Sequence, residues 1–294
     1  MENKFKGKKV LVFGLGLNQG GVGVARFFAK AGAKVRVTDT KSEQELKPSL
    51  KELEEFSGIE YHLGAHSNDD IDWADLIIKN PAVKLGNPFM EYAKQQGKQV
   101  EMEMGIFLEF VKPFQIIGVT GTKGKSTTSS LINQALQNQS KNVVFGGNIG
   151  TSVLDAITEI DQDTLVVLEI SSFQLEAFKQ HQVSPKYAVI TNIFEDHLNY
   201  YKNMKDYVEA KRVIAKYQTA DDFLFINGTD LVLTGPEFLW DLKGKIIKFS
   251  LEDLPKDFKF TLPGEHNKLN YAAALAVAKT LEIDEQSFRN YESI

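Results

Sequence analysis

The sequence predicts an α/β protein with two domains, each built around a parallel β-sheet. Short apolar runs alternate along the chain with helical patterns, which is typical of βαβ units. Two of the apolar runs lead directly into glycine-rich turns that are followed by helices. The chain has 294 residues, which leaves room for about two domains. We therefore expect two successive α/β domains.

The composition excludes several classes of protein. Hydrophobic residues make up 43% of the chain and charged residues 25%, which excludes a disordered or collagen-like chain. The net charge of −5 argues against general binding of nucleic acid, which requires a basic field. The chain has no cysteine, which excludes disulfides and thiolate metal sites.

The sequence also argues against a membrane-spanning or secreted protein. No apolar run approaches the roughly 20 residues that a membrane span needs. The apolar stretch behind the charged N-terminus, Val10 to Phe13, is too short for a signal peptide. We therefore expect a cytoplasmic monomer whose partners are small molecules rather than nucleic acid or a membrane.

The first part of the chain predicts strands at Lys9 to Phe13, Lys34 to Thr38 and Leu76 to Ile78. It predicts helices at Val22 to Ala31, near Leu50 to Phe56 and near Phe89 to Gln96. Proline stops a helix just before a new strand, so Val111, Lys112 and Pro113 mark the predicted domain boundary. The domains are then residues 1–112 and residues 113–294.

A second α/β pattern starts at Gln115, where an apolar strand runs to Val119 and into a second glycine-rich turn. Further strands are predicted at Asn142 to Phe145, Leu165 to Leu168, Tyr187 to Ile190, Phe223 to Ile226, Lys245 to Phe249 and Phe258 to Leu262. Helices are predicted behind the turn, at Asp206 to Tyr217 and at Asn270 to Leu281.

Residues 121–127, with the sequence GTKGKST, connect a predicted strand to a predicted helix. Glycines let successive N–H groups face an anion, and the start of a helix adds its positive dipole. Lys125 would reach the β- and γ-phosphates of a nucleotide, and the Ser126 hydroxyl would bind Mg²⁺. Val119 stands where the strict P-loop pattern has glycine, so the loop is a variant. The sequence thus predicts a P-loop α/β ATPase domain, with a plain glycine-rich turn as the alternative.

The first glycine-rich turn, at Gly14 and Gly16, follows the first strand of a Rossmann-like domain. A dinucleotide fingerprint needs a third glycine where Gln19 stands, whereas Asp39 ends the second strand near the usual position of a ribose-binding acid. Three interpretations stay open: a diphosphate-bearing ligand at the start of the helix, a dinucleotide, or a tight turn without a ligand.

Two polar residues follow predicted strand ends in the second domain, and open α/β sheets bind their ligands at that edge. Glu169 is a natural Mg²⁺ ligand beside a phosphate loop, or else an acid in the first turn of the next helix. His197 is either a structural hydrogen-bonding residue or part of the same site.

Two further sets of residues have no such position at a strand end. Periodicity gives no reason to single out Lys211 on its predicted helix. Asn267 either caps the final helix or, together with Asn270, faces a base or ribose.

Several longer stretches resemble the Mur ligase family, the ATP-dependent amide-forming ligases of peptidoglycan precursor synthesis. VTGTKGKSTT resembles the family's ATP loop, and GGNIG from Gly146 and GEHNKLNYAAALA from Gly264 are also similar to the family. LEISSFQLE, from Leu168, is similar to the branch that adds D-glutamate to UDP-N-acetylmuramoyl-L-alanine. GLGL from Gly14 and VTDT from Val37 agree with the uridine-nucleotide domain of that branch.

The resemblance implies an ATP-dependent ligase of cell-wall biogenesis, and through the cell wall a link to cell shape and division. ATP would convert the substrate carboxylate to an acyl phosphate, which the amine of D-glutamate attacks. The implied cofactors are ATP and Mg²⁺. The implied catalytic residues are Lys125, Glu169, His197 and Lys211.

The resemblance also assigns ligands to the individual residues. ATP would contact Gly121, Thr122, Lys123, Gly124, Lys125, Ser126, Thr127, Asn267 and Asn270. One Mg²⁺ would bind Ser126 and Glu169, and a second His197 and Lys211, after CO₂ has carbamylated the lysine. The UDP-substrate would contact Gly16, Leu17, Asn18, Asp39, Thr40, Asn80, Asn148, Ser171 and Gln174.

The sequence departs from the family pattern at three places. The first glycine loop carries the extra residues Asn18 to Gly21, and Ala82 stands where the family usually has glycine. The family also has a third, C-terminal Rossmann-like domain, and this sequence ends at about the hinge before it. We therefore expect a deliberately shortened two-domain piece that binds UDP-substrate, binds ATP weakly and does not complete the ligation.

Other functions remain as alternatives. Another Mur ligase member would add a different amino acid. A P-loop ATPase would leave LEISSFQLE unexplained, and an NAD-dependent oxidoreductase would leave the TGTKGKS loop unexplained.

Overall fold

The computed structural model describes residues 2–17, 19–84, 86–148, 152–255 and 262–288, and it divides the chain into two compact units. The first unit holds Met1–Phe110 and Gly150–Thr158, and the second holds Val111–Ile149 and Glu159–Ile294. The chain therefore passes between the units at 110/111, at 149/150 and at 158/159. The sequence analysis assigns residues 150–158 to the second domain, whereas the structure groups them with the first unit.

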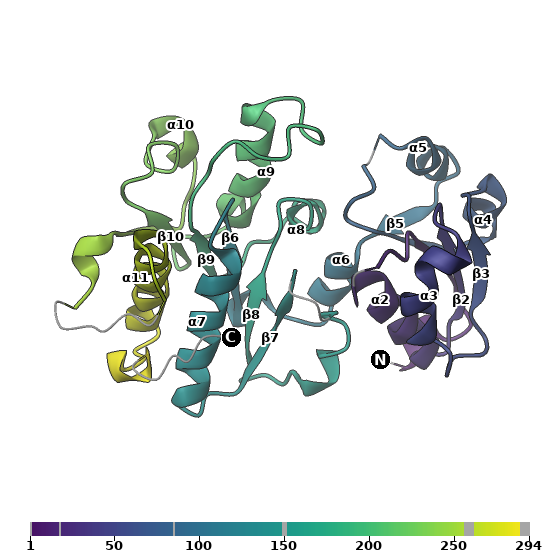
Figure 1. The fold of residues 1–294 in the computed structure, drawn as a ribbon, viewed down its shortest axis with the longest axis horizontal. Coiled ribbons are helices and arrows are strands. Elements are labelled where there is room, and N and C mark those ends of the chain that lie inside the picture. Colours follow the sequence, from purple (N-terminus) through teal and green to yellow (C-terminus); the bar gives the residue numbers. More distant parts are fainter. Residues whose placement is uncertain (1, 18, 85, 149–151, 256–261, 289–294) are drawn as a thin grey trace. The chain divides into compact units, whose positions relative to one another are not determined.

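The first unit contains a five-stranded parallel sheet with the strand order β3-β2-β1-β4-β5 (Figure 1). Its strands are β1 (Lys9–Phe13), β2 (Lys34–Asp39), β3 (Glu60–Leu63), β4 (Leu76–Lys79) and β5 (Gln99–Glu101). Its helices are α1 (Glu2–Phe5), α2 (Gln19–Lys30), α3 (Glu43–Lys51), α4 (Asn68–Trp73), α5 (Pro88–Gln95) and α6 (Glu103–Leu108). The strand order reverses between β1 and β4, which is where such sheets bind their ligands.

The second unit contains a six-stranded parallel sheet with the order β11-β10-β9-β6-β8-β7. Its strands are β6 (Ile116–Thr120), β7 (Val143–Gly147), β8 (Leu165–Glu169), β9 (Tyr187–Ile190), β10 (Phe223–Asn227) and β11 (Lys245–Phe249). Its α-helices are α7 (Lys125–Asn138), α8 (Leu175–His181), α9 (Met204–Lys216), α10 (Pro236–Leu239) and α11 (Glu265–Thr280). Both sheets confirm the predicted α/β class.

Most predicted strands are confirmed, because their apolar runs are long enough to identify. The predicted helix near Leu50 to Phe56 is wrong: α3 starts at Glu43, where Ser42 accepts a hydrogen bond from the Glu45 amide and the Glu45 carboxylate accepts one from Ser42. The elements β3, α4, β5 and α6 were not predicted, and each is only three to six residues long. The predicted strand at Phe258 to Leu262 lies almost entirely outside the described residues.

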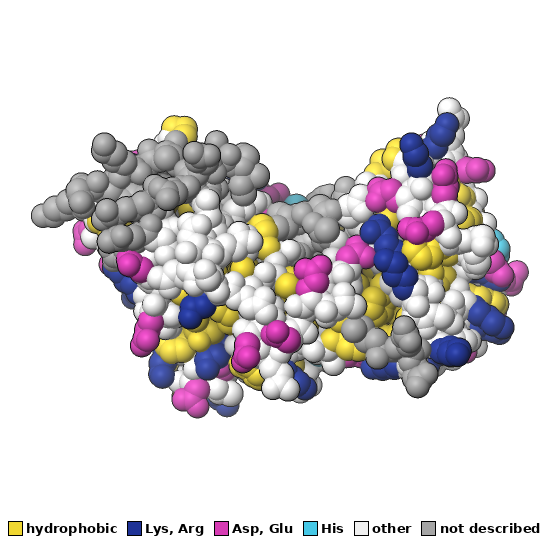
Figure 2. Space-filling view, turned by 90° about the horizontal axis from the view of Figure 1, so that it is seen from below, with side chains coloured by type: hydrophobic (Ala, Val, Ile, Leu, Met, Phe, Trp, Pro, Cys, Tyr) yellow, Lys and Arg dark blue, Asp and Glu magenta, His cyan; other side chains and the backbone are white. Residues whose placement is uncertain are grey.

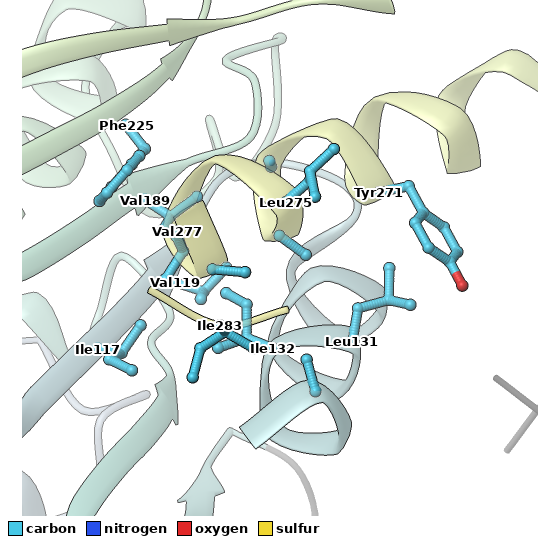
Figure 3. Close-up of a cluster of buried hydrophobic side chains, with 14 of the residues drawn as sticks. Ile117, Val119, Leu131, Ile132, Val189, Phe225, Tyr271, Leu275, Val277 and Ile283 are labelled. Carbon is cyan, nitrogen blue, oxygen red and sulfur yellow. The ribbon is translucent and has the colours of Figure 1, made fainter. Parts of the chain in front are cut away.

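The core of the second unit fixes the start of α7, which follows the second glycine-rich turn. Figure 3 shows Ile117 and Val119 of β6 facing side chains of α7 and α11. The buried side chains labelled there also include Leu131, Ile132, Val189, Phe225, Tyr271, Leu275, Val277 and Ile283. Each large side chain contributes about 1.5–3 kcal/mol by leaving water, so the position of α7 is strongly determined.

The surface carries both signs of charge. On the face in Figure 2, Asp and Glu side chains are interspersed with Lys and Arg. Within the described residues, no helix is both long enough and apolar enough to cross a membrane.

Candidate functional site

The turn between β6 and α7 can be built only with glycine at two positions. Gly121 has φ +147°, and a Cβ atom there would lie 1.9 Å from Thr191 Oγ1. Gly124 is the N-cap of α7 and has φ +86°. Both conformations strain any other residue. As the sequence predicts, the turn is a loop that leads into the N-terminus of a helix.

The segment after β9 holds this loop in place. Thr122 N donates to Asn192 O at 2.9 Å, and Lys123 N donates to the Asn192 side chain at 2.9 Å. Thr191 Oγ1 donates to Lys123 O at 2.6 Å. The loop is therefore pre-organised by two residues that the sequence analysis did not choose, although a polar pair directly behind a strand could have indicated them.

The half-buried Lys125 and the buried Lys211 converge on one carbonyl group of the loop. Lys125 Nζ donates to Gly121 O at 3.2 Å, and Lys211 Nζ donates to the same oxygen at 2.9 Å. Burial lowers the pKa of Lys125, and the nearby Glu169 carboxylate opposes that shift. Lys211 is 2% exposed, and burial together with the charge of Lys125 lowers its pKa to about 7.

Glu169 ends β8, directly beside β6, because it pairs with Val119 in the parallel register. It is 2% exposed, and its Oε1 accepts a hydrogen bond from Asn148 Nδ2 at 3.0 Å. Its Oε2 is buried and has no hydrogen-bond partner in the described structure. A buried carboxylate oxygen without a partner is unfavourable, so this atom suits a cation. The first-turn interpretation of Glu169 is wrong, because α8 begins only at Leu175.

His197 follows β9 in a left-handed conformation, with φ +55°. Its ring lies 5.0 Å from the ring of Phe173 and 6.1 Å from that of Tyr207, measured between centroids. Lys211 Nζ lies 4.7 Å from the centroid of the Tyr207 ring. Tyr207 thus contacts both His197 and Lys211. The two residues predicted to bind the second Mg²⁺ ion therefore share one neighbouring side chain.

The polar residues after β7 and β8 make two sets of contacts: Asn148 bonds to Glu169, and Ser171 bonds to Gln174. Asn148 N donates to Glu169 O at 2.9 Å, which adds to the side-chain contact. Gln174 Oε1 accepts hydrogen bonds from Ser171 N at 2.9 Å and from Ser171 Oγ at 3.0 Å. The turn from Ser171 to Gln174 is thereby closed on itself.

Asn270 on α11 lies against the second glycine-rich turn. A Cβ atom on Gly124 would be 2.2 Å from Asn270 Oδ1, and Asn270 Nδ2 donates to Asn267 Oδ1 at 3.3 Å. Asn267 Nδ2 donates to Pro263 O at 2.7 Å, and the N-cap of α11 is Gly264. The capping interpretation of Asn267 is therefore wrong.

The first unit has a comparable turn between β1 and α2. Gly14 and Gly16 have φ +91° and +65°. The buried Asp39 carboxylate accepts hydrogen bonds from Gly16 N and Lys41 N, both at 2.9 Å. From the neighbouring strand end, Asn80 Nδ2 donates to Gly14 O at 3.3 Å. The predicted residues Asp39, Asn80 and Gly16 therefore meet at the point where the strand order reverses.

The other predicted residues of this unit lie at its surface or cannot be described. Leu17 is 56% exposed, Thr40 is exposed, and Asn18 lies outside the described residues. The extra residues Gln19 to Gly21 form the first turn of α2 rather than a longer loop. A Cβ on Gly21 would lie 2.1 Å from Leu15 O, so Gly21 allows the close helix approach expected of the third glycine.

Two protein families match the sequence of these units. The Mur ligase MurD-like N-terminal domain matches residues 8–101, and the Mur ligase middle domain matches residues 119–254. The chain belongs to the Mur ligase family. This confirms the resemblance, and the two matched domains coincide with the two sheets.

Curated relatives of this Mur ligase chain are considerably longer. The UDP-N-acetylmuramoylalanine–D-glutamate ligase of Borreliella burgdorferi (strain ZS7) is 42% identical over 219 residues, which is 74% of this chain and 47% of the relative. The enzyme of the same name from Clostridioides difficile (strain 630) is 35% identical over 302 residues, which is 95% of this chain and 65% of the relative. The chain thus spans about half to two-thirds of these relatives.

Solved structures of other Mur ligases share the fold. The UDP-N-acetylmuramate:L-alanyl-gamma-D-glutamyl-meso-diaminopimelate ligase from Neisseria meningitides has a TM-score of 0.69 at 18% identity and covers 98% of this chain and 99% of that chain. The UDP-N-acetylmuramate-alanine ligase from Thermotoga maritima has a TM-score of 0.58 at 25% identity and covers 96% of this chain and 67% of that chain.

The residues predicted to bind metal ions do not form a conventional cluster. Among the described residues, no group of three or more His, Cys, Asp and Glu could hold a metal ion. The predicted ligands instead combine one carboxylate with a serine hydroxyl, a histidine and a lysine. Such a set depends on phosphate oxygens or on chemical modification of the lysine to supply more oxygen ligands.

Proposed function

We propose that this chain supplies the substrate and nucleotide domains of an ATP-dependent ligase that joins D-glutamate to UDP-N-acetylmuramoyl-L-alanine in peptidoglycan precursor synthesis. The names of the relatives at 35% and 42% identity support the reaction. The single observation that carries the assignment is the convergence of Lys125, Lys211 and Glu169 on one loop between a strand and a helix N-terminus.

The reaction needs a leaving group, because a carboxylate is a poor acylating agent. The γ-phosphoryl group of ATP moves to a carboxylate oxygen and ADP leaves. The amine of D-glutamate then attacks the carbonyl carbon and loses a proton, and inorganic phosphate departs. The protein mainly positions the reactants and neutralises charge. We assign that work to Lys125 and to the amides of residues 121–127 at the start of α7.

The residues present fit a Mg²⁺ ion beside the phosphates. The buried Glu169 Oε2 lacks a partner, and the exposed Ser126 stands in the first turn of α7. Glu169 and Ser126 would hold one ion, which supplies charge neutralisation at the phosphate oxygens when bound.

A second ion would need an oxygen ligand from Lys211, since an ammonium group cannot bind a cation. With a pKa of about 7, a large share of the Lys211 amine is neutral at neutral pH. The neutral amine is the form that attacks CO₂, giving a carbamate and releasing a proton. His197 and the carbamate would then hold the second ion.

We assign the remaining residues to the two substrates. Asp39, Thr40, Gly16, Leu17 and Asn18 would hold the uracil and the diphosphate. We also assign Asn80 of the first unit, and Asn148, Ser171 and Gln174 of the second unit, to binding of the UDP-substrate. Asn267 and Asn270 would face the adenine, which agrees with the contact of Asn270 with the phosphate loop.

Calorimetry with this chain tests the proposal. UDP-N-acetylmuramoyl-L-alanine should bind with a measurable heat, whereas NADH should not. Binding of NADH alone would favour an oxidoreductase, and steady ATP hydrolysis without UDP-substrate would favour a P-loop ATPase. Because the chain spans only about half to two-thirds of its curated relatives, we expect no steady release of phosphate on addition of D-glutamate. Sustained release from this chain would contradict that expectation.

A further inference from the structure

A segment that lies between β7 and β8 in the sequence forms part of the first unit. Its described side chains are largely buried, with Ser152 at 3%, Val153 at 3% and Leu154 at 2% exposure. The anchor of the segment is Glu103, the first residue of α6. Glu103 Oε1 accepts hydrogen bonds from Ser152 Oγ at 2.5 Å and from Val153 N at 3.1 Å.

The same segment packs closely against α2. A Cβ atom on Gly23 would lie only 2.0 Å from Ser152 Cβ, so only glycine permits this approach. Farther along, Arg26 Nη1 lies 3.3 Å from Asp155 Oδ2. Residues 152–155 are thus fixed between Glu103 on one side and α2 on the other.

The second oxygen of Glu103 reaches the beginning of α2. Glu103 Oε2 lies 3.3 Å from the position of a Cβ atom on Gly20, in the first turn of the helix. The start of a helix carries a partial positive charge, which favours a nearby anion. An ionised Glu103 and a bound diphosphate would therefore share the same helix end and repel each other.

The charge of Glu103 changes near neutral pH. Burial raises its pKa to about 7, and the hydrogen bonds from Ser152 and Val153 oppose that shift. Asp155 adds a smaller repulsion in the same direction as burial. The charges around Asp155 are those of Arg26, Lys30 and Glu52, of which Arg26 lies within ion-pair distance.

We propose that Glu103 is a positioning residue of the diphosphate site, holding residues 152–154 against α2 and setting by its protonation how strongly the start of this helix binds an anionic ligand. The inference rests on the proposed function, which places the diphosphate of the UDP-substrate there. Binding of the diphosphate to the half-ionised protein raises the pKa of Glu103 further, so that binding takes up part of a proton from solution.

Calorimetry with UDP-N-acetylmuramoyl-L-alanine tests this proposal, because the phosphates and the carboxylate of that ligand do not titrate around neutral pH. The affinity of the unmodified chain should fall about tenfold between about pH 6 and pH 8.5. At pH 7 the heat of binding should depend on the ionisation enthalpy of the buffer, in the direction of proton uptake. Affinity that is constant across this range, with heats independent of the buffer, would overturn the inference.

Two variants separate the charge of Glu103 from its structural contacts. Glu103→Gln retains an acceptor for Ser152 and Val153 but cannot ionise, so its affinity should be independent of pH and close to the low-pH value of the unmodified chain. Ser152→Ala removes a hydrogen bond that lowers the pKa of Glu103, so the fall in affinity should move to higher pH. A purely structural role would give neither result.

Glu109→Gln is the matched control, since this carboxylate belongs to the same unit, is partly exposed and pairs with Lys4. It should keep the pH dependence of the unmodified chain. A dependence that persists in Glu103→Gln would overturn the inference and leave the UDP site intact. Failure of the unmodified chain to bind the ligand at any pH would overturn the proposed function, and the inference with it.

Discussion

The two glycine-rich turns of this protein have similar backbone conformations, but a negatively charged side chain contacts the first turn and positively charged side chains contact the second. Each connects a central parallel strand to a helix, and each contains glycines with positive φ. In the first turn the buried Asp39 carboxylate accepts a hydrogen bond from the Gly16 amide. In the second turn the anchors are the uncharged side chains of Thr191 and Asn192. Two lysine side chains there, one half-buried and one buried, donate to Gly121 O.

This difference indicates that the first turn is suited to binding a ligand and the second turn to a reaction of its ligand. The first turn uses an anion to fix one of its own amides and carries no charged side chain from Gly14 to Leu17. It suits a ligand whose phosphates stay intact. The second turn concentrates positive charge where a phosphoryl group would be transferred. The Glu169 carboxylate lies close enough to Lys125 to affect its pKa. Backbone geometry alone would not have distinguished the two.

The largest expected effect comes from removing the positive charge of the second turn. Lys125→Met should weaken binding of a fluorescent ATP analogue about 100-fold, because methionine cannot replace the positive charge of this half-buried side chain. Lys123→Met is the control: its side chain is 77% exposed, so we expect less than about a threefold change. Equal losses in the two variants would show that the turn does not concentrate its charge at Lys125.

A smaller effect should appear in stability. Unfolded lysine keeps its proton to about pH 10.4, whereas buried Lys211 loses it near pH 7. Between these values the unfolded state binds more protons, so the contribution of this group to stability rises with pH and is least favourable below pH 7. Lys211→Met should therefore raise the free energy of unfolding at pH 7 by about 2 kcal/mol, with the gain shrinking toward pH 10.

Urea denaturation at several pH values measures this gain. Lys205→Met, on the exposed face of the same helix, should change stability by less than about 0.5 kcal/mol at any pH. A Lys211→Met protein that is less stable than the unmodified chain at pH 7 would mean that the hydrogen bond to Gly121 outweighs the burial of the charge.

The smallest effect concerns the anchor of the first turn. Asp39→Ala frees the Gly16 amide and should weaken binding of UDP-N-acetylmuramoyl-L-alanine about tenfold, while ATP affinity stays unchanged. Asp69→Ala, at an exposed position of the same unit, should leave both affinities unchanged. If Asp39→Ala weakened ATP binding as well, the assignment of one turn to each ligand would fail.

The fold was largely predictable from apolar runs and glycine-rich turns. The bounds of β1 and β9 agree with the sequence prediction, because a buried parallel strand leaves a continuous apolar run. The bounds of β11 also agree, although most of its residues are exposed. The position of α3 was missed because its start depends on a local hydrogen-bond pair at Ser42 and Glu45 rather than on periodicity. The packing partner of residues 150–158 could not be predicted, since no local pattern states which domain a connecting segment contacts.

In the candidate site, too, contacts between residues adjacent in the sequence were predictable, and contacts between residues far apart in the sequence were not. The loop at Gly121 to Lys125 was predictable, because its residues are adjacent in the sequence. Lys211 lies 90 residues from its acceptor, Gly121 O. Its burial depends on how α9 packs, so only family resemblance could indicate it in advance. The role of Thr191 and Asn192 as anchors needed the structure, because their hydrogen bonds reach residues that lie 68 and 69 positions away in the sequence.

The passage of residues 150–158 into the first unit has a consequence for synthesis and dissection of the polypeptide. A ribosome that has translated only Met1–Phe110 has not yet produced Val153 and Leu154, which bury themselves in that unit. In an N-terminal fragment that ends at residue 110, Glu103 and the Gly23 side of α2 would be exposed to water. The first unit is complete only after the chain has already begun to build the second, so we expect the halves to mature together rather than in turn.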